Sequence, residues 1–527
     1  MPEFDVIIVG SGPAGTSAAY PLVQAGLKVL MLDAGSEFPA PPPPSGSYLS
    51  NRALDNQQWK WMIGDTFHAL NNMDAVSPKL KTPTHKQTFE NFNEANGLQT
   101  ENFISVGSLA TGGLSNAWGC GVARFSEKDF AGLGIDYADL ERSYEVVSQR
   151  IGISGGVTDD LSSYFGVDEW AQPPLAMDRL HQRLLEKYNK RQKDFAGTGF
   201  RMGRSRIAAL SQPLGDRLAC DLSNNCLWGC HNQALYSATQ EISRLKLYPG
   251  FTFQSGVLVN QIHKEADSWI VTGSKGLQRY HAKRVLLAAG TLASTKLALK
   301  CLQHTLPVPL QASPTAAFLL WLPRMLGTGR TPTLGLGQLS YSLELTPQVT
   351  AFGSTFSTTG LPMTEFVTRT PLSKRYSVDL MANLLGSCVV GNVFLPGHLS
   401  NHSATLTGDG TLYLKGAEHP DTAALMKQTE TQLRKAYAKL GALLLPTSFT
   451  VGRPGADIHY AATLPMQSNP TQGATNRYGE VASLEGLHIV DGASLPVLTE
   501  KSHTLTIMAN ADRISRHLVT TLKNHSI

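Results

Sequence analysis

A glycine-rich turn between two apolar segments near the N-terminus constrains the fold of this chain most strongly. The run Phe4-Asp-Val-Ile-Ile-Val-Gly10 is typical of a buried β-strand, and Gly10-Ser-Gly-Pro-Ala-Gly15 follows it directly. An Ala-rich stretch and a second apolar run, Leu27 to Asp33, complete a strand, turn, helix and strand. Because an acidic residue ends the second strand roughly 20 positions after the first glycine, the pattern predicts a Rossmann-like dinucleotide-binding unit.

Each glycine of this turn has a separate task in that interpretation. Gly10 makes the tight turn, Gly12 lets the backbone approach a pyrophosphate, and Gly15 lets the helix pack closely on the strand. Ser11 belongs to the same binding turn, and the free N–H groups at the start of the helix attract phosphate. Asp33 would accept hydrogen bonds from ribose hydroxyls.

Composition excludes several other classes of protein. The 527 residues are 42% apolar and only 16% charged, which is typical of a compact globule rather than a disordered chain. The net charge of +4 is spread without blocks of like charge, so a nucleic-acid partner is not expected. The longest apolar run, Ala316 to Leu322, is too short to span a membrane. The first strand leaves no room for an export signal, so we expect a cytoplasmic location.

The rest of the chain predicts an α/β fold with two interleaved domains. Strand-like runs near Val257 to Ile262 and Arg284 to Gly290 extend the first unit. From about residue 306 to 450, alternating segments rich in Gly, Ser and Thr favour an antiparallel sheet with helices. We assign the nucleotide-binding domain to residues 1–150, 205–305 and 450–527. We assign the second, substrate-binding domain to residues 151–204 and 306–449.

Two proline features interrupt these patterns. Pro21 lies inside the first predicted helix and should kink or shorten it. The run Pro39 to Pro44 indicates a stiff spacer of polyproline type.

Three later segments, together with the N-terminal turn and in this order, resemble the glucose-methanol-choline (GMC) family of flavin oxidoreductases. They are Gly112-Gly-Leu-Ser-Asn-Ala-Trp-Gly-Cys-Gly121, Asp457-Ile-His-Tyr-Ala-Ala-Thr-Leu-Pro-Met466 and Leu487-His-Ile-Val-Asp-Gly-Ala-Ser-Leu-Pro496. The first of these looks most like the branch around pyranose 2-oxidase and related bacterial sugar and alcohol oxidoreductases. The resemblance implies FAD as the cofactor, bound by the Rossmann-like domain.

The resemblance also implies which residues surround the flavin. Gly112 and Gly113 would lie against the ring or pyrophosphate, since missing side chains permit close approach. Asn116 and Trp118 would wall the site. Some family members attach the flavin through a histidine at the position of Ala117, so the FAD of this chain is expected to be non-covalent. The other cofactor-binding residues assigned are Val259, Asp491, Gly492 and Thr506.

Two histidines are the catalytic candidates. Oxidation of an alcohol to a carbonyl needs a proton acceptor, a hydride acceptor and a donor that steadies the developing alkoxide. By resemblance, His459 would be the general base, because a free imidazole is mostly neutral at physiological pH, and hydride would pass to the flavin N5. His503 would orient the substrate oxygen, although the register counted back from Thr506 also allows Ser502.

The resemblance implies oxidation of a hydroxyl-bearing carbon, with a sugar, glycoside or polyol favoured by the polar strands of the second domain. Two alternatives stay open. The run Phe318 to Leu322 could wall a site for an apolar long-chain or terpenoid alcohol, and the same fold hosts non-redox flavin lyases. The electron acceptor would be oxygen, a quinone or a redox protein, and Gly119 slightly favours a dehydrogenase.

Cysteines form the remaining cluster of reactive side chains. Cys220, Cys226 and Cys230 precede His231, but structural zinc sites usually show paired short Cys spacings. We therefore expect no metal and interpret these residues as buried thiols. Cys120, beside the predicted flavin loop, is expected to be a packed thiol.

Overall fold

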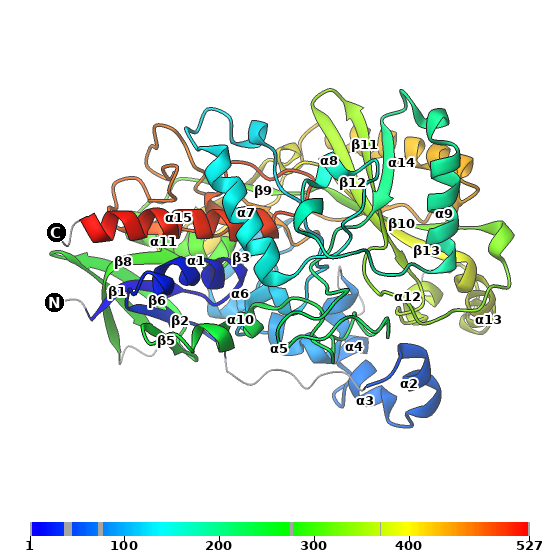
Figure 1. Cartoon of the computed structure of the whole chain (residues 1–527), viewed down its shortest axis with the longest axis horizontal. Coiled ribbons are helices and arrows are strands. Elements are labelled where there is room, and N and C mark those ends of the chain that lie inside the picture. Colours follow the sequence, from blue (N-terminus) through cyan, green and yellow to red (C-terminus); the bar gives the residue numbers. More distant parts are fainter. Residues whose placement is uncertain (1–2, 36–44, 72–76, 274–277, 369, 525–527) are drawn as a thin grey trace.

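A computed structural model describes residues 3–35, 45–71, 77–273, 278–368 and 370–524 of the chain. Three β-sheets and the helices around them form the molecule, and both termini lie beside the first sheet (Figure 1). The proline-rich spacer expected at Pro39 to Pro44 lies outside the described residues.

The first sheet has seven strands in the order β5-β2-β1-β8-β7-β6, with β19 paired to β8. Their bounds are β1 (Phe4–Val9), β2 (Val29–Leu32), β5 (Phe251–Gln254), β6 (Val259–Glu265), β7 (Ser268–Gly273), β8 (Arg279–Leu287) and β19 (Leu487–Ile489). Strands β5, β2, β1, β8 and β19 run parallel, while β6 and β7 join antiparallel. This arrangement confirms the predicted α/β class with a Rossmann-type sheet.

Helices cover the first sheet and explain why β1 is an unbroken apolar run. On one face pack α1 (Pro13–Gln24) and α15 (Thr504–Asn524), with α7 (Tyr137–Ile151) against α15 (Figure 1). The side chains of α11 (Thr291–Leu302) join the apolar cluster on the other face. Because both faces are buried, Val6, Ile7 and Ile8 are 0% exposed.

The expectation that Pro21 shortens the first helix is wrong. Helix α1 continues through Pro21 to Gln24. A proline removes one backbone donor, and the burial of Leu22 and Val23 in the core beside α15 offsets that loss.

The second sheet is antiparallel, in the order β16-β10-β13-β12-β11-β4, with β17 paired to β10. Its strands are β4 (Phe200–Arg204), β10 (Thr315–Trp321), β11 (Leu339–Thr346), β12 (Val349–Ser357), β13 (Cys388–Phe394), β16 (Leu443–Leu444) and β17 (Thr450–Val451). Helices α9 (Arg179–Lys190) and α14 (Thr422–Lys439) pack their apolar faces on it. An antiparallel sheet with helices is thus present where the alternating segments predicted one.

A third sheet, in the order β18-β9-β14-β15-β3, was not predicted. It consists of β3 (Leu98–Glu101), β9 (Val308–Ala312), β14 (His402–Leu406), β15 (Leu412–Lys415) and β18 (Tyr460–Ala461). Strands this short carry little periodicity, and the sheet joins segments from both predicted domains. The domain boundaries themselves stay a prediction.

Shorter helices complete the fold. They are α2 (Tyr48–Leu54), α3 (Gln58–Met62), α4 (His68–Asn71), α5 (Lys86–Phe89), α6 (Phe92–Ala95), α8 (Ser162–Phe165), α10 (Ala238–Leu245), α12 (Thr364–Val367) and α13 (Lys374–Leu384). Within the described part of the chain, no helix has both the length and the apolar character needed to cross a membrane.

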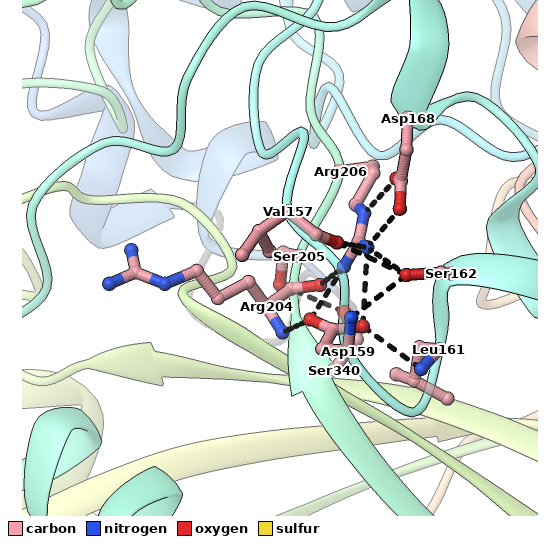
Figure 2. A network of polar contacts seen from close by, with 9 residues as sticks. All are labelled: Val157, Asp159, Leu161, Ser162, Asp168, Arg204, Ser205, Arg206 and Ser340. Atoms are coloured by element: carbon pink, nitrogen blue, oxygen red, sulfur yellow. Dashed lines mark hydrogen bonds and ion pairs between the residues drawn. The ribbon is translucent and has the colours of Figure 1, made fainter.

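A buried arginine supports the second sheet where it meets the rest of the molecule. The Arg206 side chain is 0% exposed and donates to Asp159 at 2.9 Å and to Asp168 at 2.7 Å (Figure 2). It also donates to the backbone oxygen of Val157 at 2.8 Å. A buried guanidinium is stable only when its charge and its donors are matched, so these contacts fix the 157–168 segment.

Candidate active site

A cavity of about 610 Å³ is lined by residues from the first and second sheets. Its lining includes the glycine turn and Asp33, the 106–123 segment, polar and aromatic side chains of β11 to β13, and both candidate histidines. One cavity therefore joins the predicted cofactor turn to the predicted catalytic groups.

The glycine turn has the geometry that its sequence predicted. A Cβ on Gly10, whose φ is +104°, would lie 2.4 Å from the Ala288 backbone oxygen. A Cβ on Gly15 would lie 2.0 Å from the Gly10 oxygen, so neither position accepts a side chain. A Cβ on Gly12 would meet no protein atom within 4 Å, and Gly12 lines the cavity. Of the three glycines, Gly12 is thus the one whose missing side chain leaves open space in the cavity.

Asp33 anchors this turn to the neighbouring loop. Its carboxylate accepts hydrogen bonds from the Ser11 backbone N–H at 2.8 Å, the Ser11 hydroxyl at 2.6 Å and the Gly35 N–H at 2.8 Å. Gly112 N–H donates to the Ser11 hydroxyl oxygen at 2.9 Å. Burial raises the pKa of Asp33. Asp33 lines the cavity, and its contact with a ribose stays a prediction.

The predicted flavin loop approaches the glycine turn closely. A Cβ on Gly113 would lie 3.4 Å from Gly12 Cα, and both Gly112 and Gly113 have positive φ. The cavity lining includes Gly113, Ala117 and Trp118. The Trp118 Nε1–H donates to the backbone oxygen of Tyr236 at 2.9 Å. The two glycines therefore allow a close backbone approach that a side chain would prevent.

Two predicted cofactor contacts do not reach the cavity lining. The Asn116 amide donates to the backbone oxygen of Thr111 at 2.8 Å and accepts from the Ser237 hydroxyl at 2.8 Å. Asn116 therefore stabilises the loop on the side away from the cavity. The Thr506 hydroxyl bonds the Tyr144 hydroxyl at 2.7 Å and joins α15 to α7. The structure thus places Asn116 and Thr506 outside the cavity lining, and their contacts with the cofactor stay predictions. Gly15 and Gly112 also lie behind the lining.

Three of the residues assigned to cofactor binding line the cavity, namely Val259, Asp491 and Gly492. The Asp491 carboxylate accepts from the Gly290 N–H at 2.9 Å and the Ser294 hydroxyl at 2.5 Å. Burial raises the pKa of Asp491 to about 6. These contacts hold the loop after β19 against the start of α11.

The two histidines lie against each other at the cavity wall. Their ring centroids are 5.2 Å apart, with the planes at 84°. Burial lowers the pKa of His459 to about 4, and burial together with the His459 ring lowers that of His503 to about 3. Both imidazoles are therefore neutral near physiological pH. Ser502 also lines the cavity, but His503 is the residue whose ring packs on His459.

Three cavity residues had no role in the sequence interpretation. Lys79 donates from Nζ to the Trp118 oxygen, and burial lowers its pKa. Asp457 lies two residues before His459, and Arg206 lines the wall beside Ser205. Asp457 lies in a turn and Lys79 in the short 3-10 helix Pro78–Lys81, and neither segment is long enough for periodicity to mark the direction of a side chain.

The far wall of the cavity combines hydroxyl groups with aromatic rings. Ser205, Ser340 and Ser354 form a chain of hydroxyl contacts at 2.8 and 2.9 Å, the first of them visible in Figure 2. Asn392 accepts from the Ser354 N–H at 2.8 Å. The aromatic residues of this wall are Phe352, Phe356 and Phe394.

The apolar run Phe318 to Leu322 does not wall the cavity. Phe318, Leu320 and Leu322 pack into the core with α9 and α14. Side chains alternate along a strand, and the residue of β10 that lines the cavity is Ala317. The run is a core strand rather than a lid.

The cysteines are free thiols. Burial raises the pKa of Cys120 to about 12 and of Cys220 to about 11, and raises that of Cys226 as well. Among the described residues, no group of three or more His, Cys, Asp or Glu side chains is arranged to hold a metal ion.

Two regions of the chain, one near each end, match the models of known protein families. Residues 4–112 match the pyridine nucleotide-disulphide oxidoreductase family, and residues 417–511 match the GMC oxidoreductase family. The C-terminal match agrees with the resemblance to the GMC oxidoreductase family. The second match includes His459, His503 and the Asp491 loop, so the C-terminal segments that carry the resemblance lie inside the matched region.

The chain is also similar to one curated protein and to one solved structure. The fructose dehydrogenase large subunit of Gluconobacter japonicus is 24% identical over 317 residues, which cover 56% of this chain and 54% of that subunit. The match thus spans about half the length of the curated relative. The crystal structure of pyridoxine 4-oxidase from Mesorbium loti has a TM-score of 0.59 at 14% identity, covering 98% of this chain and 99% of that one. The second likeness shows that the fold is shared along the whole chain.

FAD is the cofactor of this chain, and the residues present fit it. Gly12 borders open space at the N-terminus of α1, where a helix dipole and free N–H groups favour a pyrophosphate. Gly113 and Ala117 give the neighbouring loop a surface without large side chains, against which a flat ring system can lie.

Proposed function

We propose that this protein is an FAD-dependent oxidoreductase that oxidises a hydroxyl-bearing carbon to a carbonyl, with a sugar, glycoside or polyol as the favoured substrate class. The observation that carries the proposal is the His459–His503 pair, two neutral imidazoles in contact on the wall of the cavity that begins at the FAD turn. The relatives named fructose dehydrogenase and pyridoxine 4-oxidase support an oxidative activity.

The two imidazoles would divide the work on the substrate hydroxyl. His459 lines the cavity and has Nδ1 near Asp457, so Nε2 would be the nitrogen that accepts the hydroxyl proton. His503 would donate a hydrogen bond to the same oxygen and steady its developing negative charge. Bound FAD supplies the acceptor for the hydride that leaves the carbon, at the flavin N5.

The favoured substrate class rests on the far wall of the cavity. Ser205, Ser354 and Asn392 present hydroxyl and amide groups beside the rings of Phe352 and Phe394. A polyhydroxylated ring matches this combination, because its hydroxyls pair with polar groups while its C–H face packs on aromatic rings. An apolar alcohol has less support, since the run Phe318 to Leu322 packs in the core.

The experiment that tests the function is anaerobic titration of the purified yellow protein with sugars, glycosides, polyols and long-chain alcohols, followed by its visible spectrum. We expect one sugar or polyol to bleach the flavin absorbance and acid precipitation to release the FAD, since Ala117 offers no atom for a covalent bond. Bleaching by an apolar alcohol alone would contradict the substrate class. Conversion of a substrate without bleaching would favour a non-redox lyase, and admission of air would distinguish an oxidase from a dehydrogenase.

Substitution at His503 tests its role as a hydrogen-bond donor. We expect His503→Asn to keep most of the rate of flavin reduction and His503→Ala to lose about tenfold to a hundredfold, because the asparagine amide can still donate to the substrate oxygen. Stopped-flow reduction with the bleaching substrate measures both. Equal losses in the two variants would argue against this role, and Ser502→Ala is the matched control for the alternative register.

A further inference from the structure

Asp457 lies behind His459 in a position that the family resemblance does not explain. Its side chain is 0% exposed, and its Oδ2 lies 3.6 Å from His459 Nδ1, within ion-pair distance but longer than a hydrogen bond. Oδ2 also accepts the Ser313 N–H at 2.9 Å, which ties the carboxylate to the end of β9. Oδ1 is buried without a partner among the described residues. The carboxylate therefore keeps unused hydrogen-bonding capacity beside the ring.

The backbone between the two residues adopts a costly conformation. Ile458 has a φ of +63°, in the left-handed region that β-branched residues avoid. This residue turns the chain between Asp457 and His459. A strained backbone persists only where the surrounding contacts hold it, and here it lies between the acid and the imidazole.

We propose that Asp457 is a positioning residue: it orients His459 through Nδ1 and balances the positive charge that the ring gains when Nε2 takes the proton of the substrate hydroxyl. This inference rests on the proposed function of His459 as the base. The proton leaves the substrate oxygen and bonds to Nε2, so the ring gains one positive charge. An ionised Asp457 carboxylate opposite that ring makes the pair neutral overall. A neutral pair is stable in a buried site, whereas a lone imidazolium there is not.

The electrostatics of the site explain why such a partner is needed. Burial lowers the pKa of His459 to about 4 and raises the pKa of Asp457 well above its usual range. Burial disfavours each charge alone, whereas an imidazolium and a carboxylate 3.6 Å apart would stabilise each other. The other titratable groups that face the pair are His503 and Tyr460. Among the described residues, no lysine or arginine forms an ion pair with Asp457 or His459.

The test compares the pH dependence of His459 in the FAD-loaded wild type, Asp457→Asn and Asp457→Glu. Diethylpyrocarbonate reacts with neutral imidazole, and peptide mass spectrometry measures its addition to His459. We expect the apparent pKa of His459 to fall by about one unit or more in Asp457→Asn, because the stabilising charge is removed, and to stay near the wild-type value in Asp457→Glu. Glu480→Gln is the matched control, since it removes the carboxylate 3.9 Å from the ring of His488 and should leave His459 unchanged.

The rate of flavin reduction gives the second readout. Asp457→Asn should reduce its flavin at least tenfold more slowly on the alkaline plateau, with the acidic limb of the pH profile moved to lower pH. An unchanged pH dependence of His459 in Asp457→Asn would overturn the role of Asp457, whatever the rate of flavin reduction. If the asparagine variant fails to bind FAD, loss of the wild-type pKa in Asp457→Glu overturns it instead. Normal reduction in His459→Ala would overturn the proposed function, which is a separate result.

Discussion

Replacement of His459 by alanine should leave FAD bound and slow anaerobic flavin reduction by about 10²- to 10⁴-fold, the usual contribution of a general base. The ring lies on the cavity wall, with 27% of its side chain accessible, and within the described part of the chain no hydrogen bond to the ring is formed. Its removal should therefore change the chemistry more than the fold. Stopped-flow absorbance with the bleaching substrate measures the rate, and the flavin-to-protein absorbance ratio measures cofactor content.

His263→Ala provides a control for this experiment. His263 lies on β6 and pairs with Glu265 at 2.9 Å on the surface, so its loss should leave the reduction rate unchanged. A near-normal rate of flavin reduction in His459→Ala would show that His459 is not the general base. A loss of flavin together with the rate would mean that His459 supports the cofactor site instead.

Replacement of Gly12 by valine should yield a folded protein that has lost most of its FAD. The φ of Gly12 is −66°, which any residue adopts, and a Cβ there meets no protein atom within 4 Å. The added side chain would instead enter the space assigned to the pyrophosphate. Overpacking of this kind costs about 1 to 3 kcal/mol, so FAD affinity should fall by roughly tenfold to a hundredfold. Flavin fluorescence titration of the apoprotein measures the affinity, and circular dichroism reports the fold.

Two further glycines give this prediction its controls. Gly408→Val adds the same side chain at an exposed turn, where a Cβ also meets no atom within 4 Å, and should keep full FAD affinity. Gly10→Ala should fail to fold normally, because its Cβ would lie 2.4 Å from the Ala288 oxygen at a φ of +104°. Tight FAD binding by Gly12→Val would show that the pyrophosphate does not lie at this turn.

Local sequence was sufficient for β1, β2 and the glycine turn between them. A strand, a glycine turn and a helix are contiguous in the chain, so the constraints on Gly10, Gly12 and Gly15 can be derived from neighbouring residues. The face of α7 that carries Leu140, Tyr144 and Val147 is buried, as its helical periodicity indicates. The third sheet escaped prediction because its strands are short and come from five separate places in the chain.

The sequence by itself determined the Rossmann-type unit, the GMC segments and the two histidines as candidates, because each depends on residue types at short, fixed spacing. Tertiary structure alone decided which polar atoms were free for a ligand. Asn116 and Thr506 carry suitable groups, but Ser237 and Tyr144, distant in sequence, already pair with them. Asp457 became significant only because the fold buries it and leaves its Oδ1 unpaired beside His459. Hydrogen-bond satisfaction is a property of the packed chain, and no spacing along the sequence encodes it.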